Sequence, residues 1–292
     1  MILETPVWRE RQQAHHDAVD QRTGAHLTRR RRQQAHPVYD FLFDYYPTRP
    51  AHLRRWHPGA GVWLKDPAAT AVHHGWRDYT RRGGTVGLDV DGFLARRGAA
   101  VDQIEHLLVS TANNAAHFDC FGLHEWAMCY REKQPRHDLP LRLGQAGTDA
   151  VVEAHQLKCT HYDAYRFFTA AATPLNLTVL QRQDQADNDQ PGCVHAAMDL
   201  YKWAGKLAPL IPSEVWLQAF DLAVDARVLD MEASPYDCRG LGFEVVAIET
   251  AEGKAEYVRR QRALSQRADR LRARLVALIH TARRAKLPAN TD

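Results

Sequence analysis

Histidine is abundant in this chain, with 16 residues in 292, and several imidazoles lie next to carboxylates in recurring patterns. The segments HFD at 117–119 and HYD at 161–163 share the order histidine, aromatic residue, aspartate. His195 and Asp199 are four residues apart, so they share one face if their segment is helical. A carboxylate beside an imidazole fixes its tautomer and raises its basicity, which suits both acid–base catalysis and metal binding.

Aromatic residues flank most of these groups, which predicts a pocket whose walls are rings. Burial among rings raises the pKa of a carboxylate and offers flat faces to a planar or cationic ligand. The candidate catalytic residues are Asp119, His124, Glu125, His161 and Asp163. The candidate substrate-binding residues are Trp126, Tyr162, Tyr165, Asp199 and Lys202. The candidate ligands, if the protein binds iron, zinc or manganese, are His117, His124, His161 and His195, with Asp119 and Asp163 as carboxylate partners.

Each of these pairs also has a purely structural interpretation. Histidine and aspartate at helical spacing are commonly just hydrogen-bonded to each other, and sixteen histidines produce coincidences. Lys202 could form a Schiff base if buried, but a salt bridge to Asp199, three residues earlier, is the simpler expectation. The chain has no GxGxxG after a strand and no GxxxxGK[ST], so the nucleotide-binding folds that use these motifs are unsupported. It also has no GxSxG and no HExxH, the motifs of the α/β-hydrolase nucleophile and of zinc metalloproteases.

Hydrophobic spacing predicts a mainly α fold, one helical domain over residues 1–292 with a few short strands. A basic helical segment (1–35) precedes a core with the candidate pocket (36–249), and a basic helix (250–292) follows it. The expected helices are 5–34, a short one from Pro37 to Pro47, 73–84, 99–130 with a break at Gly122, 193–207, 212–232 and 253–285. The expected strands are 61–64, 85–90 and 243–248. Residues 151–168 are strand-like at first and helical later, and loops are expected over 133–149 and 181–192.

Charge and composition limit the classes of protein to which this chain can belong. The net charge is +3, but residues 1–32 carry +3, residues 250–292 carry +7 and the stretch between them carries −7. Basic ends suit either nucleic-acid binding or packing on an acidic core. We expect a cytoplasmic protein with no membrane span, because no apolar run is long enough, the start lacks a signal-peptide pattern, and five cysteines form no CxxC pair.

Much of the chain between residues 36 and 237 resembles an actinobacterial family that carries the name 3-methyladenine DNA glycosylase. The segments that carry the resemblance are HPVYDFLFDYYPTRPAHLRRWHPGAGVWL (36–64), HFDCFGLHEWAMCYR (117–131), PLRLGQAGTDAVVEAH (140–155), HYDAYRFFTAAATPLN (161–176), QPGCVHAAMDLYKWAGKLAPLIPSE (190–214) and MEASPYD (231–237).

The resemblance implies hydrolysis of the N-glycosidic bond of an alkylated purine in double-stranded DNA, without a cofactor. The damaged base would flip into an aromatic pocket, where Asp119, Glu125 or Asp163 would assist its departure. Arg29 to Arg32 or the basic C-terminal helix would hold phosphates. Two alternatives stand beside this function: a metal-dependent enzyme acting on a small molecule, and a helical binding protein without catalysis. The sequence does not determine the oligomeric state.

Overall fold

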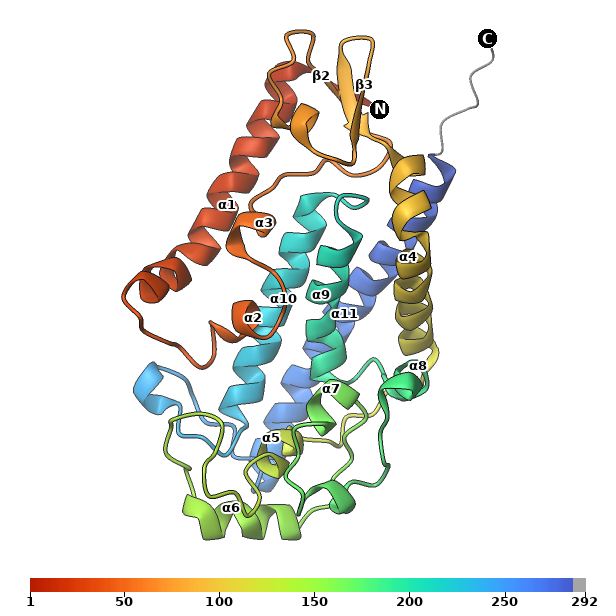
Figure 1. The fold of residues 1–292 in the computed structure, drawn as a ribbon. Helices are drawn as coiled ribbons and strands as arrows, with labels where there is room; N and C mark the ends of the chain where they lie inside the picture. Colours follow the sequence, from red (N-terminus) through yellow and green to blue (C-terminus); the bar gives the residue numbers. More distant parts are fainter. Residues whose placement is uncertain (286–292) are drawn as a thin grey trace.

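Long helices dominate the computed structural model, which describes residues 1–285 (Figure 1). The five longest are α1 (Thr5–Arg31), α4 (Val90–Asn113), α9 (Val194–Leu207), α10 (Ser213–Glu232) and α11 (Ala251–Arg284). Helices α9 and α10 follow each other in the chain and pack side by side, α11 packs against both, and α4 packs on α11. The predicted mainly α fold with a few short strands is confirmed.

The central position of α9 follows from its composition. Ten of its fourteen residues are buried, and the four that are not, Lys202, Trp203, Gly205 and Lys206, lie together near its end. The apolar part of a helix is stable only against other apolar surface, so most of α9 lies inside the protein. His195 and Asp199 lie on this helix, so their polar side chains are carried into the core. Their burial requires polar partners there, because an unpaired buried polar group is costly.

The polar N-terminal helix α1 is one continuous helix, and Gly24 does not break it. Only a narrow stripe of α1 is buried, and it consists of Trp8, His15, Val19, Thr23 and His26. The helix therefore lies on the outside of the molecule (Figure 1). Its last turn holds Arg29, Arg30 and Arg31, whose charges stabilise the negative end of the helix dipole.

One small sheet lies beside the start of α1 (Figure 1). Its four strands are β1 (Ile2–Leu3), β2 (Trp63–Lys65), β3 (Tyr79–Arg82) and β4 (Thr85–Leu88), in the order β1-β2-β4-β3. The first two strands pair in parallel, and the remaining pairs are antiparallel. Leu3, Leu64 and Val86 of the sheet form a second small core with Trp8 and Trp56.

Short helices and loops connect these parts. The short α-helices are α2 (Phe41–Asp44), α3 (Pro50–Leu53), α5 (Leu123–Ala127), α6 (Gly144–Glu153), α7 (Tyr162–Tyr165) and α8 (Gln185–Asn188). The 3₁₀ turns are η1 (Val72–Gly75), η2 (Thr173–Leu175), η3 (Arg182–Asp184) and η4 (Arg239–Leu241). None of the helices in residues 1–285 has the length and apolar character that crossing a membrane requires.

Several predicted elements were wrong. Residues 243–248 were expected to form a strand, but they pair with no strand of residues 1–285; Val246 instead donates its backbone N–H to the carbonyl of Glu232 at the end of α10. Residues 73–84 form a 3₁₀ turn and β3 rather than a helix. Gly83 and Gly84 both have positive φ, so they turn the chain back as a two-residue hairpin.

Further boundaries differ from the prediction. The expected helix 99–130 is α4, which ends at Asn113, and the short α5, with no helix over residues 114–122 between them. The expected loop 133–149 already contains the first turns of α6, and the segment 151–168 has no strand. Ser213 begins α10 without capping it, because its hydroxyl accepts from the backbone N–H of His57 and donates to the carbonyl of Arg55. The expected helix over 253–285 is confirmed as α11, whereas residues 286–292 of the predicted basic segment lie outside the described residues.

Candidate functional site

Three buried histidines from different elements converge in the core. His124 is on α5, His161 immediately precedes α7, and His195 is on α9; each is at most 8% exposed. The ring of His195 lies edge-on to that of His124, with 4.5 Å between ring centroids. The ring of His195 also stacks on that of His161, with centroids 5.5 Å apart. His195 therefore links the other two imidazoles.

His161 is held by a carboxylate on one side and faces a second carboxylate on the other. Its Nδ1 lies 2.8 Å from Oδ1 of Asp189, which follows α8. An ionised carboxylate can only accept hydrogen bonds, so Nδ1 carries the hydrogen. Gln185 donates to the other oxygen of Asp189 at 2.8 Å and fixes that carboxylate. Nε2 of His161 then points toward Asp199, whose Oδ2 is 3.9 Å away.

Asp199 and Asp163 share one ammonium group. Nζ of Lys202 lies 2.6 Å from Oδ2 of Asp199 and 3.4 Å from Oδ2 of Asp163. The hydroxyl of Tyr46 donates to Oδ1 of Asp199 at 3.3 Å. Burial opposes the charged form of Lys202, but the charge and hydrogen bond of Asp199 outweigh burial and raise the pKa of Lys202. The lysine is therefore a cation in a salt bridge to Asp199, which disfavours a Schiff base.

A second ionic group lies behind His195. Nη1 of Arg227 donates to Oε1 of Glu125 at 2.8 Å and to Oδ2 of Asp230 at 2.7 Å. The other oxygen of Asp230 accepts from Nε2 of His124 at 2.6 Å. Arg227, Glu125, Asp230 and His124 are all buried, so these four side chains form an ionic network inside the helical core.

The pKa values of the three histidines diverge for identifiable reasons. Burial alone would lower each of them, but Asp230 raises the pKa of His124 well above its ordinary value and Asp189 raises that of His161. His195 has no carboxylate hydrogen-bonded to it within residues 1–285, so burial, and then the charge of His124, lower its pKa well below the ordinary value. The result is one neutral imidazole beside two that favour the protonated form.

These side chains surround a cavity of about 20 Å³, enough for one water molecule or one metal ion. The polar part of its lining consists of Glu125, Arg136, His137, His161, Asp163, His195, Asp199 and Arg227. The rings that line it are Phe41, Tyr45, Tyr46, Phe167 and Tyr236. The cavity is thus walled by rings and contains imidazoles and acids, but it is far smaller than a purine base.

Two sets of side chains have atoms close enough to one another to hold a metal ion. One set is His161, Asp163 and Asp199, and the other is His124, His195 and Asp230; within each set the ligand atoms lie within 4.8 Å of one another. The first set lines the cavity. Of the second set only His195 lines the cavity, whereas His124 and Asp230 lie buried away from it. The first set is therefore the better candidate for a metal site.

Some predicted site residues lie elsewhere. His117 is exposed, and Asp119 forms an exposed ion pair with Lys158 at 2.6 Å, so neither joins the cavity. Trp126 is fully buried and donates its indole N–H to the carbonyl of Ala233, which makes it part of the core rather than a stacking surface. Tyr165 is buried and packs in the main hydrophobic core.

Other predicted residues lie at or beside the cavity. Asp163, Glu125 and His161 line it, and Asp199 and Lys202 form the salt bridge just described. Tyr162 is half-buried, and the guanidinium of Arg182 stacks on its ring at 5.2 Å.

Sequence reasoning missed three central residues. Asp189 lies at the end of a polar segment expected to be a plain loop, and Arg227 and Asp230 lie on α10, where they are buried. Only the last two gave a local signal, since they are three residues apart on a predicted helix and so on one face.

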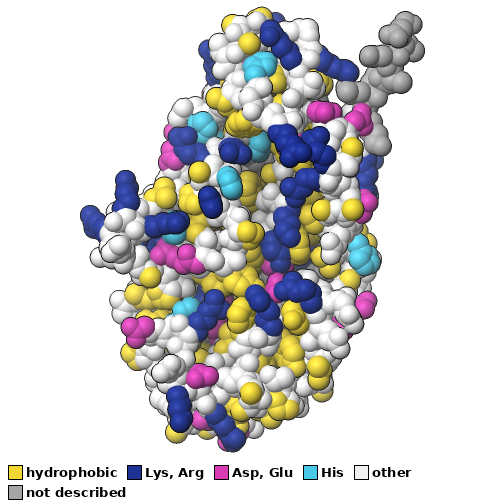
Figure 2. Space-filling view, viewed as in Figure 1, with side chains coloured by type: hydrophobic (Ala, Val, Ile, Leu, Met, Phe, Trp, Pro, Cys, Tyr) yellow, Lys and Arg dark blue, Asp and Glu magenta, His cyan; other side chains and the backbone are white. Residues whose placement is uncertain are grey.

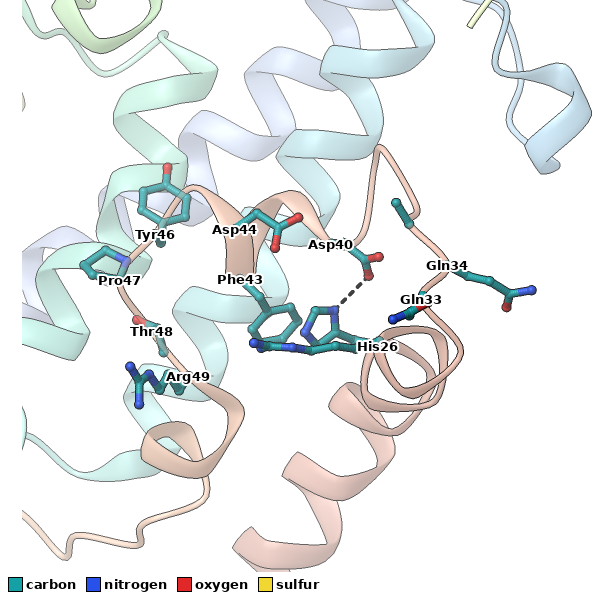
Figure 3. Close-up of a pocket in the computed structure, with 12 residues that line it drawn as sticks. His26, Gln33, Gln34, Asp40, Phe43, Asp44, Tyr46, Pro47, Thr48 and Arg49 are labelled. Atoms are coloured by element: carbon teal, nitrogen blue, oxygen red, sulfur yellow. Dashed lines mark hydrogen bonds and ion pairs between the residues drawn. The ribbon is translucent and has the colours of Figure 1, made fainter. Parts of the chain in front are cut away.

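A separate pocket of about 700 Å³ lies between the end of α1 and the loop after α2 (Figure 3). In it, Nδ1 of His26 lies 2.8 Å from Oδ1 of Asp40, and Arg29 also bonds this carboxylate. The ring of His26 stacks on that of Phe43, with centroids 4.2 Å apart. Asp40 thus pairs with His26 rather than with the imidazole of His36, its neighbour four residues earlier, whose backbone N–H it accepts.

Comparison with protein-family models, with curated proteins and with solved structures finds no match to this chain.

Proposed function

We propose that this protein is a metal-dependent enzyme that acts on a small molecule, with His161, Asp163 and Asp199 as metal ligands. The observation that carries the proposal is the setting of His161. Its Nδ1 is bonded to Asp189, and its Nε2 faces Asp199 across 3.9 Å on the wall of a cavity. A histidine that binds a metal commonly has its other nitrogen held by a carboxylate in this way.

The donor set fits a divalent transition metal. One imidazole nitrogen and two carboxylate groups suit iron, zinc or manganese. The size of the cavity fits an ion better than an organic ligand. A metal bound there would act as a Lewis acid or activate a water molecule. Three ligands leave coordination positions for substrate or water.

The surrounding residues have separate roles in this proposal. Asp189 orients His161, and Lys202 balances the charge of Asp199 and Asp163. Lys202 also competes with a metal ion for the same carboxylates. The rings around the cavity limit access of water to the centre. His195 stacks on His161 and restricts its ring orientation.

Metal content tests the proposal directly. Protein purified without added metal is analysed by inductively coupled plasma mass spectrometry, together with His161→Gln and Asp199→Asn variants. We expect about one ion per chain in the wild type and a large loss in both variants. The matched controls are His117→Gln and Asp119→Asn, which change the same residue types at exposed positions. Metal absent from every wild-type preparation, or retained in both site variants, contradicts the proposal.

A second candidate is the N-glycosylase activity that the sequence resemblance implies. The aromatic wall favours it, since Phe41, Tyr45 and Phe167 surround a pocket that contains the carboxylates of Asp163 and Glu125. The walls would have to open to admit an alkylated purine. Release of 3-methyladenine from methylated duplex DNA tests this candidate, with Asp163→Asn as the site variant and Asp119→Asn as the control. No release by the wild type removes it.

A further inference from the structure

Two cavities meet on the surface of α9 and form one groove beside the histidine–carboxylate centre. Their volumes are about 540 and 490 Å³, and both are lined by Pro47, Lys202 and Lys206. Figure 2 shows lysine and arginine side chains following one another down the middle of this face. We call these two cavities together the α9 groove.

The α9 groove has far more positive than negative charge. Seven lysine or arginine side chains line it, against two aspartates, Asp78 and Asp163. Asp78 is paired with Arg96, which does not line the groove. Asp163 is shared by Arg166, Arg182 and Lys202. The acids of the groove therefore do not balance its cations.

Four groove cations have no carboxylate partner within residues 1–285: Arg55, Arg77, Arg97 and Lys206. They come from the α3–β2 loop, the turn before β3, α4 and α9, so the fold brings them together from distant parts of the chain. Burial, and then the charges of Lys202, Arg97 and Arg182, lower the pKa of Lys206. A bound anion would relieve this repulsion.

The α9 groove opens directly beside the candidate metal ligands. Tyr45, Tyr46 and Asp163 line both the groove and the small cavity. Lys202 extends from the groove to Asp199 at 2.6 Å. A ligand held in the groove would thus have one end next to the histidine–carboxylate centre.

We propose that the α9 groove binds a ligand with several phosphate groups, held by Arg97, Lys206 and the neighbouring cations. Guanidinium and ammonium groups are the side chains that recognise phosphate, and several of them together match a ligand with several charges. That this ligand is the substrate rests on the proposed function, whereas its binding does not. A nucleotide or polyphosphate and a nucleic-acid strand present the same phosphate chemistry.

Binding is measured by calorimetry with inorganic tripolyphosphate and by fluorescence anisotropy with a labelled single-stranded oligothymidine. The test protein carries Arg97→Ala with Lys206→Ala. The control carries Arg270→Ala with Arg274→Ala, an equal loss of charge at exposed positions on α11 that line a different pocket. We expect the groove variant to weaken binding about tenfold or more and the control to change it much less.

The outcomes distinguish a small phosphorylated ligand from a nucleic-acid strand. They also distinguish failure of this inference from failure of the proposed function. Groove-dependent binding of tripolyphosphate supports a small phosphorylated ligand, and groove-dependent binding of the oligonucleotide alone supports a nucleic-acid strand. No binding of either probe, or equal weakening in the groove and control variants, overturns the inference. Metal content is measured in the same preparations. A wild type that holds no metal but binds phosphate in the groove contradicts the proposed function and leaves this inference standing.

Discussion

Nε2 of His161 faces Oδ2 of Asp199 across 3.9 Å, while Nδ1 of the same ring is bonded to Asp189 at 2.8 Å. The distance across to Asp199 is too long for a hydrogen bond but short enough for both atoms to bind one ion. Asp189 thus fixes Nδ1 of the imidazole, and Nε2 is available to bind an ion together with Asp199. The first two predictions follow from this arrangement.

Asp189→Asn should weaken metal binding about 10- to 100-fold with little change in fold, because the amide no longer fixes the hydrogen on Nδ1 of His161. The measurement is equilibrium dialysis against zinc or manganese. Asp187→Asn is the control, since Asp187 is an exposed residue of α8, the helix that Asp189 follows. Equal affinity in the two variants would show that Asp189 does not orient a ligand.

Lys202→Met should strengthen metal binding, by about tenfold, because the ammonium that competes for Asp199 and Asp163 is gone. Lys206→Met is the matched control: it lies one turn later on α9 and has no carboxylate partner within the described residues. The same dialysis measures both variants. A weaker affinity in Lys202→Met would mean that the lysine supports the site instead of competing for it.

Arg227→Met should lower the free energy of unfolding by about 3–5 kcal/mol, because it leaves the buried carboxylate of Glu125 without a cation and removes one of the two partners of Asp230, which keeps His124. Arg267→Met removes an exposed partner of Asp225 and should cost less than about 1 kcal/mol. Urea unfolding followed by circular dichroism compares the two. Similar losses would show that the Arg227 network is not a stabilising part of the core.

Stability should fall as the pH drops from about 6.5 toward 4. Burial lowers the pKa of His57 to about 3 and that of His73 to about 4, so the folded protein keeps both neutral while the unfolded chain takes up protons below its own pKa of 6.5. Each histidine then lowers the free energy of unfolding by about 1.4 kcal/mol per pH unit within this window. Above pH 6.5 their stabilising effect is fully present.

Urea midpoints between pH 7 and 4.5 measure this slope. Nε2 of His73 donates to the carbonyl of Trp56 at 2.9 Å, because a carbonyl oxygen can only accept, so Nε2 carries the hydrogen in the neutral ring. The variant His73→Gln can keep this hydrogen bond without titrating, and its slope should be smaller than that of the wild type. An unchanged slope would contradict the assignment to this histidine.

Local pattern was enough to predict much of the helical framework. The apolar spacing in 193–207 and 212–232 predicts two buried helices, and both are present as α9 and α10. The polar segment 5–34 predicts the outer helix α1. The pairing of Asp199 with Lys202 follows from a separation of three residues on one helix. In each case the interacting atoms are within a few residues, so the helix geometry itself determines which side chains meet.

Which residues form the candidate site depends on contacts between residues far apart in the sequence. No local sequence pattern indicates these contacts. His124 meets Asp230 across 106 residues, and His161 meets Asp189 across 28. His117 has the same sequence pattern as His161, yet it is exposed. Residues 243–248 were predicted as a strand, but the end of α10 rather than a strand lies beside them. Sequence periodicity determined which face of a helix is apolar, whereas the packing of distant elements decided which acid meets which imidazole, since buried polar groups take whichever partners the fold brings within hydrogen-bond distance.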